Sequence, residues 1–128
     1  MNFDRIAELD DRELAIGLSR ARCVIGLSCI VAPSLLSRAM LGDASPAVRA
    51  ATRFAGIRDL ALGVGALNSL KDRSHDAEWV SMGAISDAFD GVVAMMQPGL
   101  PLRGRAMGAG ALGLGGYLLM LSRRLSHS

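Results

Sequence analysis

Four charged residues lie at least one helical turn inside apolar stretches of the sequence, where a charge is costly and therefore informative. Arg58 and Asp59 are adjacent in one apolar stretch, and Asp87 and Asp90 lie three residues apart in the next. On a helix, a spacing of three places both carboxylates on one face. Two such carboxylates beside a guanidinium can form a buried ion pair, bind a ligand or carry a proton, so these are the chemistries open to the chain.

A charge at the centre of a membrane-spanning helix costs about 2.5 to 3.5 kcal/mol, so such residues face inward and are paired. We predict that Arg58 pairs with Asp87 or Asp90 where two helices meet. Arg53 and Asp59 are expected nearer the membrane surface. The predicted charge cluster, which is also the candidate ligand-binding site, consists of Arg53, Arg58, Asp59, Asp87 and Asp90. No residue is predicted to be catalytic.

The elements that position these charges are four apolar stretches separated by charged or Pro/Gly-rich breaks, a pattern typical of membrane-spanning helices. The predicted spans are residues 21–36, 54–70, 79–96 and 106–121. Residues 1–20 alternate apolar and charged side chains, which predicts a short amphipathic helix before the first span. We therefore predict an all-α fold over residues 1–128, a single integral membrane domain in which that amphipathic helix precedes a four-transmembrane-helix bundle.

A soluble four-helix bundle is the alternative, because Arg58, Asp59, Asp87 and Asp90 lower the hydropathy of two of the stretches. Each helix of a soluble bundle shows a polar face to water. Residues 106–121 contain no charged side chain and offer no such face. The membrane architecture is therefore favoured.

The distribution of basic residues predicts the side of the membrane on which the termini lie. Four spans bring both termini to one side. Eight Lys and Arg residues lie on that side and five on the opposite side, which favours cytoplasmic termini in a multi-pass protein of the cytoplasmic (inner) membrane. The terminal side holds Arg5, Arg12, Arg20, Arg22, Lys71, Arg73, Arg123 and Arg124, and the opposite side holds Arg38, Arg49, Arg53, Arg103 and Arg105.

Glycines recur at helical spacing along the third and fourth spans. Small residues let helix backbones approach closely in lipid, where packing drives association. We predict that they pack within the bundle, and a dimer face on the fourth span is the alternative. The predicted helix-packing residues are Gly56, Gly63, Gly83, Gly91, Gly104, Gly108 and Gly113.

Residues 87–94 read DAFDGVVA, which is similar to the first half of the motif of CDP-alcohol phosphotransferases, whose aspartates bind a metal and cytidine diphosphate. The similarity ends there. Met95 stands where that family places an Arg, and a second pair of aspartates is missing beyond Gly104. We therefore predict no metal and no cofactor.

A second resemblance covers roughly residues 15–122. Residues 53–63 read RFAGIRDLALG and are followed by a charged loop and by the DAFD segment. This order resembles an uncharacterised family of small four-span membrane proteins of actinobacteria, with a GxRDxxxG segment and a DxxD span. The resemblance implies the four-helix membrane architecture and no activity.

The composition bears on function mainly by exclusion. Disorder is not expected with 51% hydrophobic residues, and a net charge of +2 does not favour nucleic acid as a partner. We predict an accessory or scaffolding subunit whose partners are membrane lipids and either another protein or a second copy. The alternatives are a binder or transporter of a small or lipid-like molecule that uses Arg58, Asp87 and Asp90, and, third, a membrane isomerase or cyclase.

Overall fold

The computed structural model describes the backbone of residues 3–72 and 75–127, and the side chains of these residues except 3–9 and 76. The described residues form helices and contain no strand, so the all-α prediction is confirmed. The helices are α1 (Phe3–Val31), α2 (Pro33–Leu41), α3 (Pro46–Asp72), α4 (Asp76–Met96) and α5 (Leu102–Ser126).

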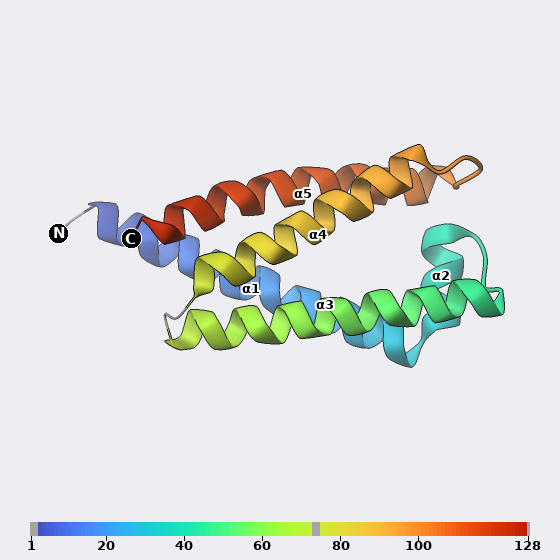
Figure 1. The fold of residues 1–128 in the computed structure, drawn as a ribbon, viewed down its shortest axis with the longest axis horizontal. Helices are drawn as coiled ribbons and strands as arrows, with labels where there is room; N and C mark the ends of the chain where they lie inside the picture. The colour runs from blue at the N-terminus through green and yellow to red at the C-terminus, as the bar shows by residue number, and fades with distance from the viewer. Residues whose placement is uncertain (1–2, 73–74, 128) are drawn as a thin grey trace.

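The four long helices form two antiparallel pairs (Figure 1). α1 packs along α3 and α4 packs along α5, whereas the contact between the two pairs is less extensive. The short α2 reverses the chain between α1 and α3. The start of α1 and the end of α5 therefore lie at the same end of the molecule.

The beginning of the chain differs from the sequence-based prediction. α1 continues without a break from Phe3 to Val31, so no separate amphipathic helix precedes the first span. The first predicted span, 21–36, is divided between α1 and α2. The three later predicted spans lie within single helices, 54–70 in α3, 79–96 in α4 and 106–121 in α5.

Two residues explain the reversal between α1 and α3. Pro33 ends α1, because its ring restricts the preceding residue and it has no N–H to donate. Ala32 accordingly leaves the helical conformation, with φ −126° and ψ 57°. At the end of α2, Gly42 has a left-handed φ of 73°, and its N–H donates to the Arg38 carbonyl at 3.1 Å. The chain can then return along α1.

The apolar core lies at the end of the molecule where the termini meet. All four long helices contribute to it, so it holds the two helix pairs together at that end. Its buried residues are Ala15, Leu70, Val80, Ala84, Leu118, Leu121 and Leu125.

Within each pair the helices approach closely at glycines. A Cβ on Gly26 would lie 2.6 Å from the carbonyl oxygen of Gly56, and a Cβ on Gly56 would lie 2.6 Å from that of Gly26. Between α4 and α5, a Cβ on Gly91 would lie 2.7 Å from the Gly108 carbonyl oxygen. Further close approaches within the pairs join Gly63 to Cys23 and Gly115 to Ala84, and Gly104 of α5 also approaches Met40 of α2.

Two of the glycines predicted to pack against helices behave differently. Gly113 has no atom within 4 Å of the place where a Cβ would lie, because it lies on the face of α5 opposite Gly108 and Gly115. The prediction that Gly113 packs within the bundle is therefore wrong. Gly83 faces the guanidinium of Arg22, 3.3 Å from its Cβ position, rather than another helix backbone.

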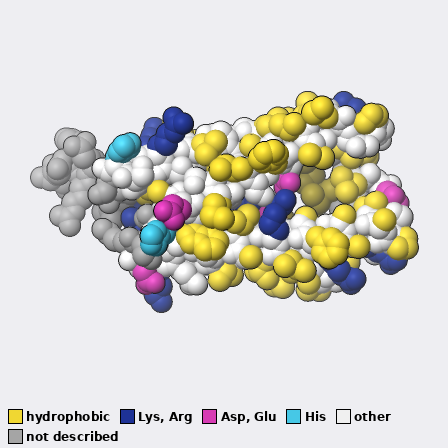
Figure 2. Space-filling view, viewed as in Figure 1, with side chains coloured by type: hydrophobic (Ala, Val, Ile, Leu, Met, Phe, Trp, Pro, Cys, Tyr) yellow, Lys and Arg dark blue, Asp and Glu magenta, His cyan; other side chains and the backbone are white. Residues whose placement is uncertain are grey.

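Many large apolar side chains are exposed on the bundle. On the face shown in Figure 2 they gather over the middle and right, where charged side chains also lie among them, and most other charged side chains lie toward the two ends. Phe54 and Phe89, for example, are 71% and 68% exposed. Other exposed apolar residues include Val24, Leu27, Ile57, Met82, Val93, Met96 and Met107. By length and composition, one helical segment in the described chain, Asp10–Val31, could cross a membrane.

Candidate functional site: a charge cluster between the helix pairs

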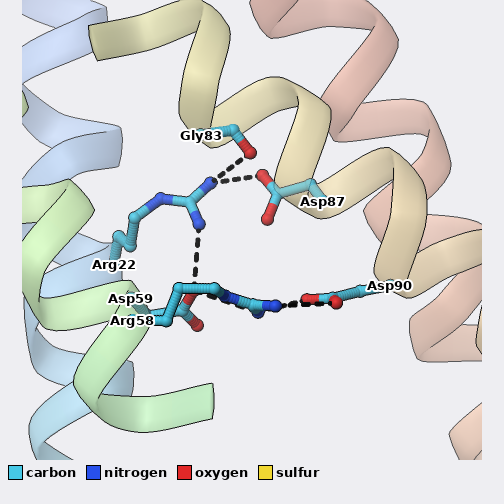
Figure 3. Close-up of polar contacts among 6 residues, drawn as sticks. All are labelled: Arg22, Arg58, Asp59, Gly83, Asp87 and Asp90. Carbon is cyan, nitrogen blue, oxygen red and sulfur yellow. Dashed lines mark hydrogen bonds and ion pairs between the residues drawn. The ribbon is translucent and has the colours of Figure 1, made fainter. Parts of the chain in front are cut away.

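Arg22 lies at the centre of a group of charges where α1, α3 and α4 meet (Figure 3). One terminal nitrogen donates to Asp59 Oδ1 at 3.2 Å. The other donates to the Gly83 carbonyl oxygen at 3.3 Å and forms a short hydrogen bond with Asp87 Oδ2. A single guanidinium from α1 therefore holds one carboxylate of α3 and one of α4.

Arg58 makes a second set of ion pairs from α3. Its two terminal nitrogens donate to Asp90 Oδ1 at 3.0 Å and Oδ2 at 2.5 Å. This is the fork geometry in which a guanidinium matches a carboxylate best. Arg58 also lies 3.4 Å from Asp59 Oδ1, so Asp59 links the two sets.

We call Arg22, Arg58, Asp59, Asp87 and Asp90 the charge cluster. Its inner half is more enclosed than its outer half: the side chains of Arg22 and Asp87 are 12% and 13% exposed, and those of Arg58 and Asp90 are 39% and 47% exposed. The cluster carries three carboxylates and two guanidiniums, which gives a formal charge of −1. It lies farther along the bundle than the apolar core and joins the two helix pairs there.

The structure resolves the alternatives for Arg58 in favour of Asp90. Asp87 pairs instead with Arg22, which sequence analysis assigned to the membrane surface beside Arg20. Because α1 begins near the start of the chain, Arg22 lies well inside the bundle. The position of Arg22 in the apolar run 14–31 could have placed it inside the bundle. The charged residues before Arg22 suggested instead that the first span begins at residue 21.

Arg53 does not belong to the charge cluster, contrary to the prediction. Its Nε donates to the Ile30 carbonyl oxygen at 3.4 Å, and the side chain is exposed. Five residues along a helix correspond to a rotation of roughly 140° from Arg58, which turns Arg53 away from α4. Asp59, expected beside Arg53 near the surface, lies instead between the two arginines.

A pocket of about 120 Å³ adjoins the inner half of the charge cluster. Arg22, Asp59 and Asp87 line its polar side. From there it extends toward the apolar core, beside Trp79, whose ring packs against Gly65 of α3. The remaining lining residues are almost all apolar and include Leu18, Ile25, Leu62, Val80, Leu114 and Leu118.

Two carboxylate oxygens of the charge cluster can still accept a hydrogen bond from a further molecule. Among the residues that the structure describes, no donor hydrogen-bonds to Asp87 Oδ1 or Asp59 Oδ2. The described residues contain no group of three His, Cys, Asp or Glu side chains that could hold a metal ion. The arrangement can therefore accept hydrogen bonds or a positive charge from a molecule in the pocket.

No known protein family, curated protein or solved structure matches this chain.

Proposed function

We propose that the chain is a four-span integral protein of the cytoplasmic membrane, with α1, α3, α4 and α5 crossing the bilayer. The exposed apolar side chains and the ion-paired charges between the helices support this, since side chains that face lipid are apolar and charges within the hydrocarbon region face the bundle interior and pair. α4, the shortest of the four, has 21 residues, and about 1.5 Å of rise per residue makes it roughly as long as the hydrocarbon core is thick.

The exposure of α1 supports the same placement. The segment Asp10–Val31 has a mean hydropathy of 1.7 in its most apolar window, yet only 22% of that window is buried within the bundle. The core helix of a soluble protein would be mostly buried. The resemblance to small four-span membrane proteins agrees with this architecture. A span over Asp10–Val31 takes Arg12, Arg20 and Arg22 out of the count of flanking basic residues and leaves five on each side, so cytoplasmic termini stay a prediction from the sequence.

Within the membrane, we infer that the protein is an accessory or scaffolding subunit. The observation that carries this is the outer face of α5. Gly110, Gly113 and Gly116 lie on that face, and nothing approaches within 4 Å of any of their Cβ positions. Ala106 and Ala109 extend the same exposed face. Such a strip of small residues allows a helix from another chain to approach closely in lipid.

Native mass spectrometry after gentle extraction from the host membrane tests this inference. We expect a larger assembly for the natural sequence, and its loss in Gly113→Leu, which places a bulky side chain on the strip. Gly17→Leu is the matched control, because Gly17 is also exposed and has nothing within 4 Å, but lies on α1. A monomer without a protein partner, or an assembly that survives Gly113→Leu, would contradict the proposal.

A second candidate function, the binding of a small molecule, is favoured by the pocket beside the charge cluster. Its apolar walls and few convergent polar groups are the usual features of a ligand site. Arg22, Asp59 and Asp87 would be the polar contacts, in place of the predicted set of Arg58, Asp87 and Asp90. Retention of a discrete extra mass on the extracted protein would support this function.

A further inference from the structure

We propose that the pocket between α1, α3, α4 and α5 binds an organic ammonium ion with a small apolar body. This rests on the second proposed function, ligand binding in that pocket, and specifies the chemistry of the ligand. The cationic group lies against Asp87 and Asp59, and the apolar body extends along Trp79 toward the apolar core.

The charge balance of the site selects a cation. Three carboxylates face two guanidiniums, so the charge cluster carries one negative charge more than it neutralises internally. In surroundings of low polarity, an uncompensated charge is costly. A bound ammonium ion restores neutrality and donates to Asp87 Oδ1, which accepts no hydrogen bond from the described residues.

The arrangement of Arg22 disfavours an anion. Both of its terminal nitrogens already donate, one to Asp59 and the other to Gly83 and Asp87. An anionic ligand would have to break these hydrogen bonds and would add to the excess negative charge. Arg22 instead acts as a positioning residue, which holds the two carboxylates on the polar side of the pocket.

The apolar walls set the size and shape of the ligand. A volume of about 120 Å³ is close to that of cavities of roughly 150 Å³ that accommodate one benzene ring. The indole of Trp79 lines the pocket and can also attract a cation through its ring face. The fitting class is therefore an ammonium ion attached to one ring or to a short hydrocarbon chain.

Trp79 provides a direct measurement, because it is the only tryptophan of the chain and lines the pocket. The protein is placed in nanodiscs of zwitterionic phosphatidylcholine and titrated with 2-phenylethylammonium while Trp79 fluorescence is recorded. 2-Phenylethanol and phenylacetate are the neutral and anionic comparison probes. We expect a saturable change with the cation, and at least tenfold weaker binding of the other two probes.

Three variants locate the site. Asp87→Asn should weaken binding of the cation at least tenfold. Ala21→Phe should abolish it without altering a charge, because Ala21 lines the pocket and is exposed, so a larger side chain can enter from the rim. Asp90→Asn is the comparison variant. It removes the same charge from the charge cluster but lies outside the pocket, so it should weaken binding through the charge balance alone and by less than Asp87→Asn does.

The outcomes separate the ligand class from the ligand-binding function. Equal binding of the cation and the alcohol, with loss in Ala21→Phe, would overturn the ammonium class and leave a binding pocket. Equal effects of Asp90→Asn and Asp87→Asn would overturn the contact with Asp87. No saturable response to any probe would overturn both the inference and the second proposed function.

Discussion

Single residues of this protein act mainly by pairing. In the proposed membrane placement no water is available to solvate an unpaired charge, so Arg22 and Asp87, both nearly enclosed, stabilise the bundle only as partners. Arg58 and Asp59 were recognisable from the sequence because they interrupt an apolar stretch. The partner of Asp87 was missed, because the charged residues before Arg22 outweighed the apolar run 14–31 in which it lies.

A double-mutant cycle on Arg22 and Asp87 tests this pairing. Arg22→Gln leaves Asp87 without its partner and should lower the free energy of unfolding by about 3 kcal/mol, whereas Asp87→Asn leaves Arg22 paired with Asp59 and should cost less. The double variant should lose at least about 1 kcal/mol less than the sum of the two single losses, because neither charge remains. Equilibrium unfolding in mixed micelles provides the measurement.

The control cycle combines Arg22→Gln with Asp90→Asn, which are not partners. Their coupling should be less than half of that between Arg22 and Asp87. Additive losses for Arg22 and Asp87 would show that these residues stabilise the bundle independently of each other.

At the scale of helices, small residues decide how close the elements lie. The later three helices were predictable because each contains one long apolar stretch bounded by turn residues such as Gly42 and Pro98. The contacts between helices were only partly predictable. A glycine pattern does not reveal which face meets a neighbour, which is why Gly113 was assigned to packing and Gly26 was not recognised.

The close approach of α1 and α3 leads to a prediction for Gly26→Ala. The added Cβ would lie 2.6 Å from the Gly56 carbonyl oxygen and 2.7 Å from the Leu60 nitrogen, so the two backbones must separate. We expect a loss of about 2 kcal/mol in the free energy of unfolding, a cost typical of overpacking. Unfolding in mixed micelles measures it.

Gly17→Ala is the matched control, because it makes the same change on the same helix where nothing lies within 4 Å. It should leave the free energy of unfolding unchanged or raise it by up to about 1 kcal/mol, since alanine has a higher helix propensity than glycine. If both variants lost the same stability, the close approach of α1 to α3 would not be the cause.

For the whole molecule, the distribution of polarity is the decisive feature. The apolar core at one end and the charge cluster farther along join two helix pairs that expose many large apolar side chains (Figure 2). In the proposed membrane placement these side chains face lipid and the charge cluster lies between the helices. The proposed subunit contact on α5 and the proposed ammonium pocket both depend on this placement in the membrane.

Cysteine labelling of membrane vesicles tests that placement most directly. The two natural cysteines, Cys23 and Cys29, are replaced by alanine, and a single cysteine is introduced by Ser45→Cys or Ser126→Cys. An impermeant maleimide should label the first variant only in right-side-out vesicles and the second only in inside-out vesicles. Labelling of both from one side, or recovery of the protein in the soluble fraction, would contradict a four-span bundle with cytoplasmic termini.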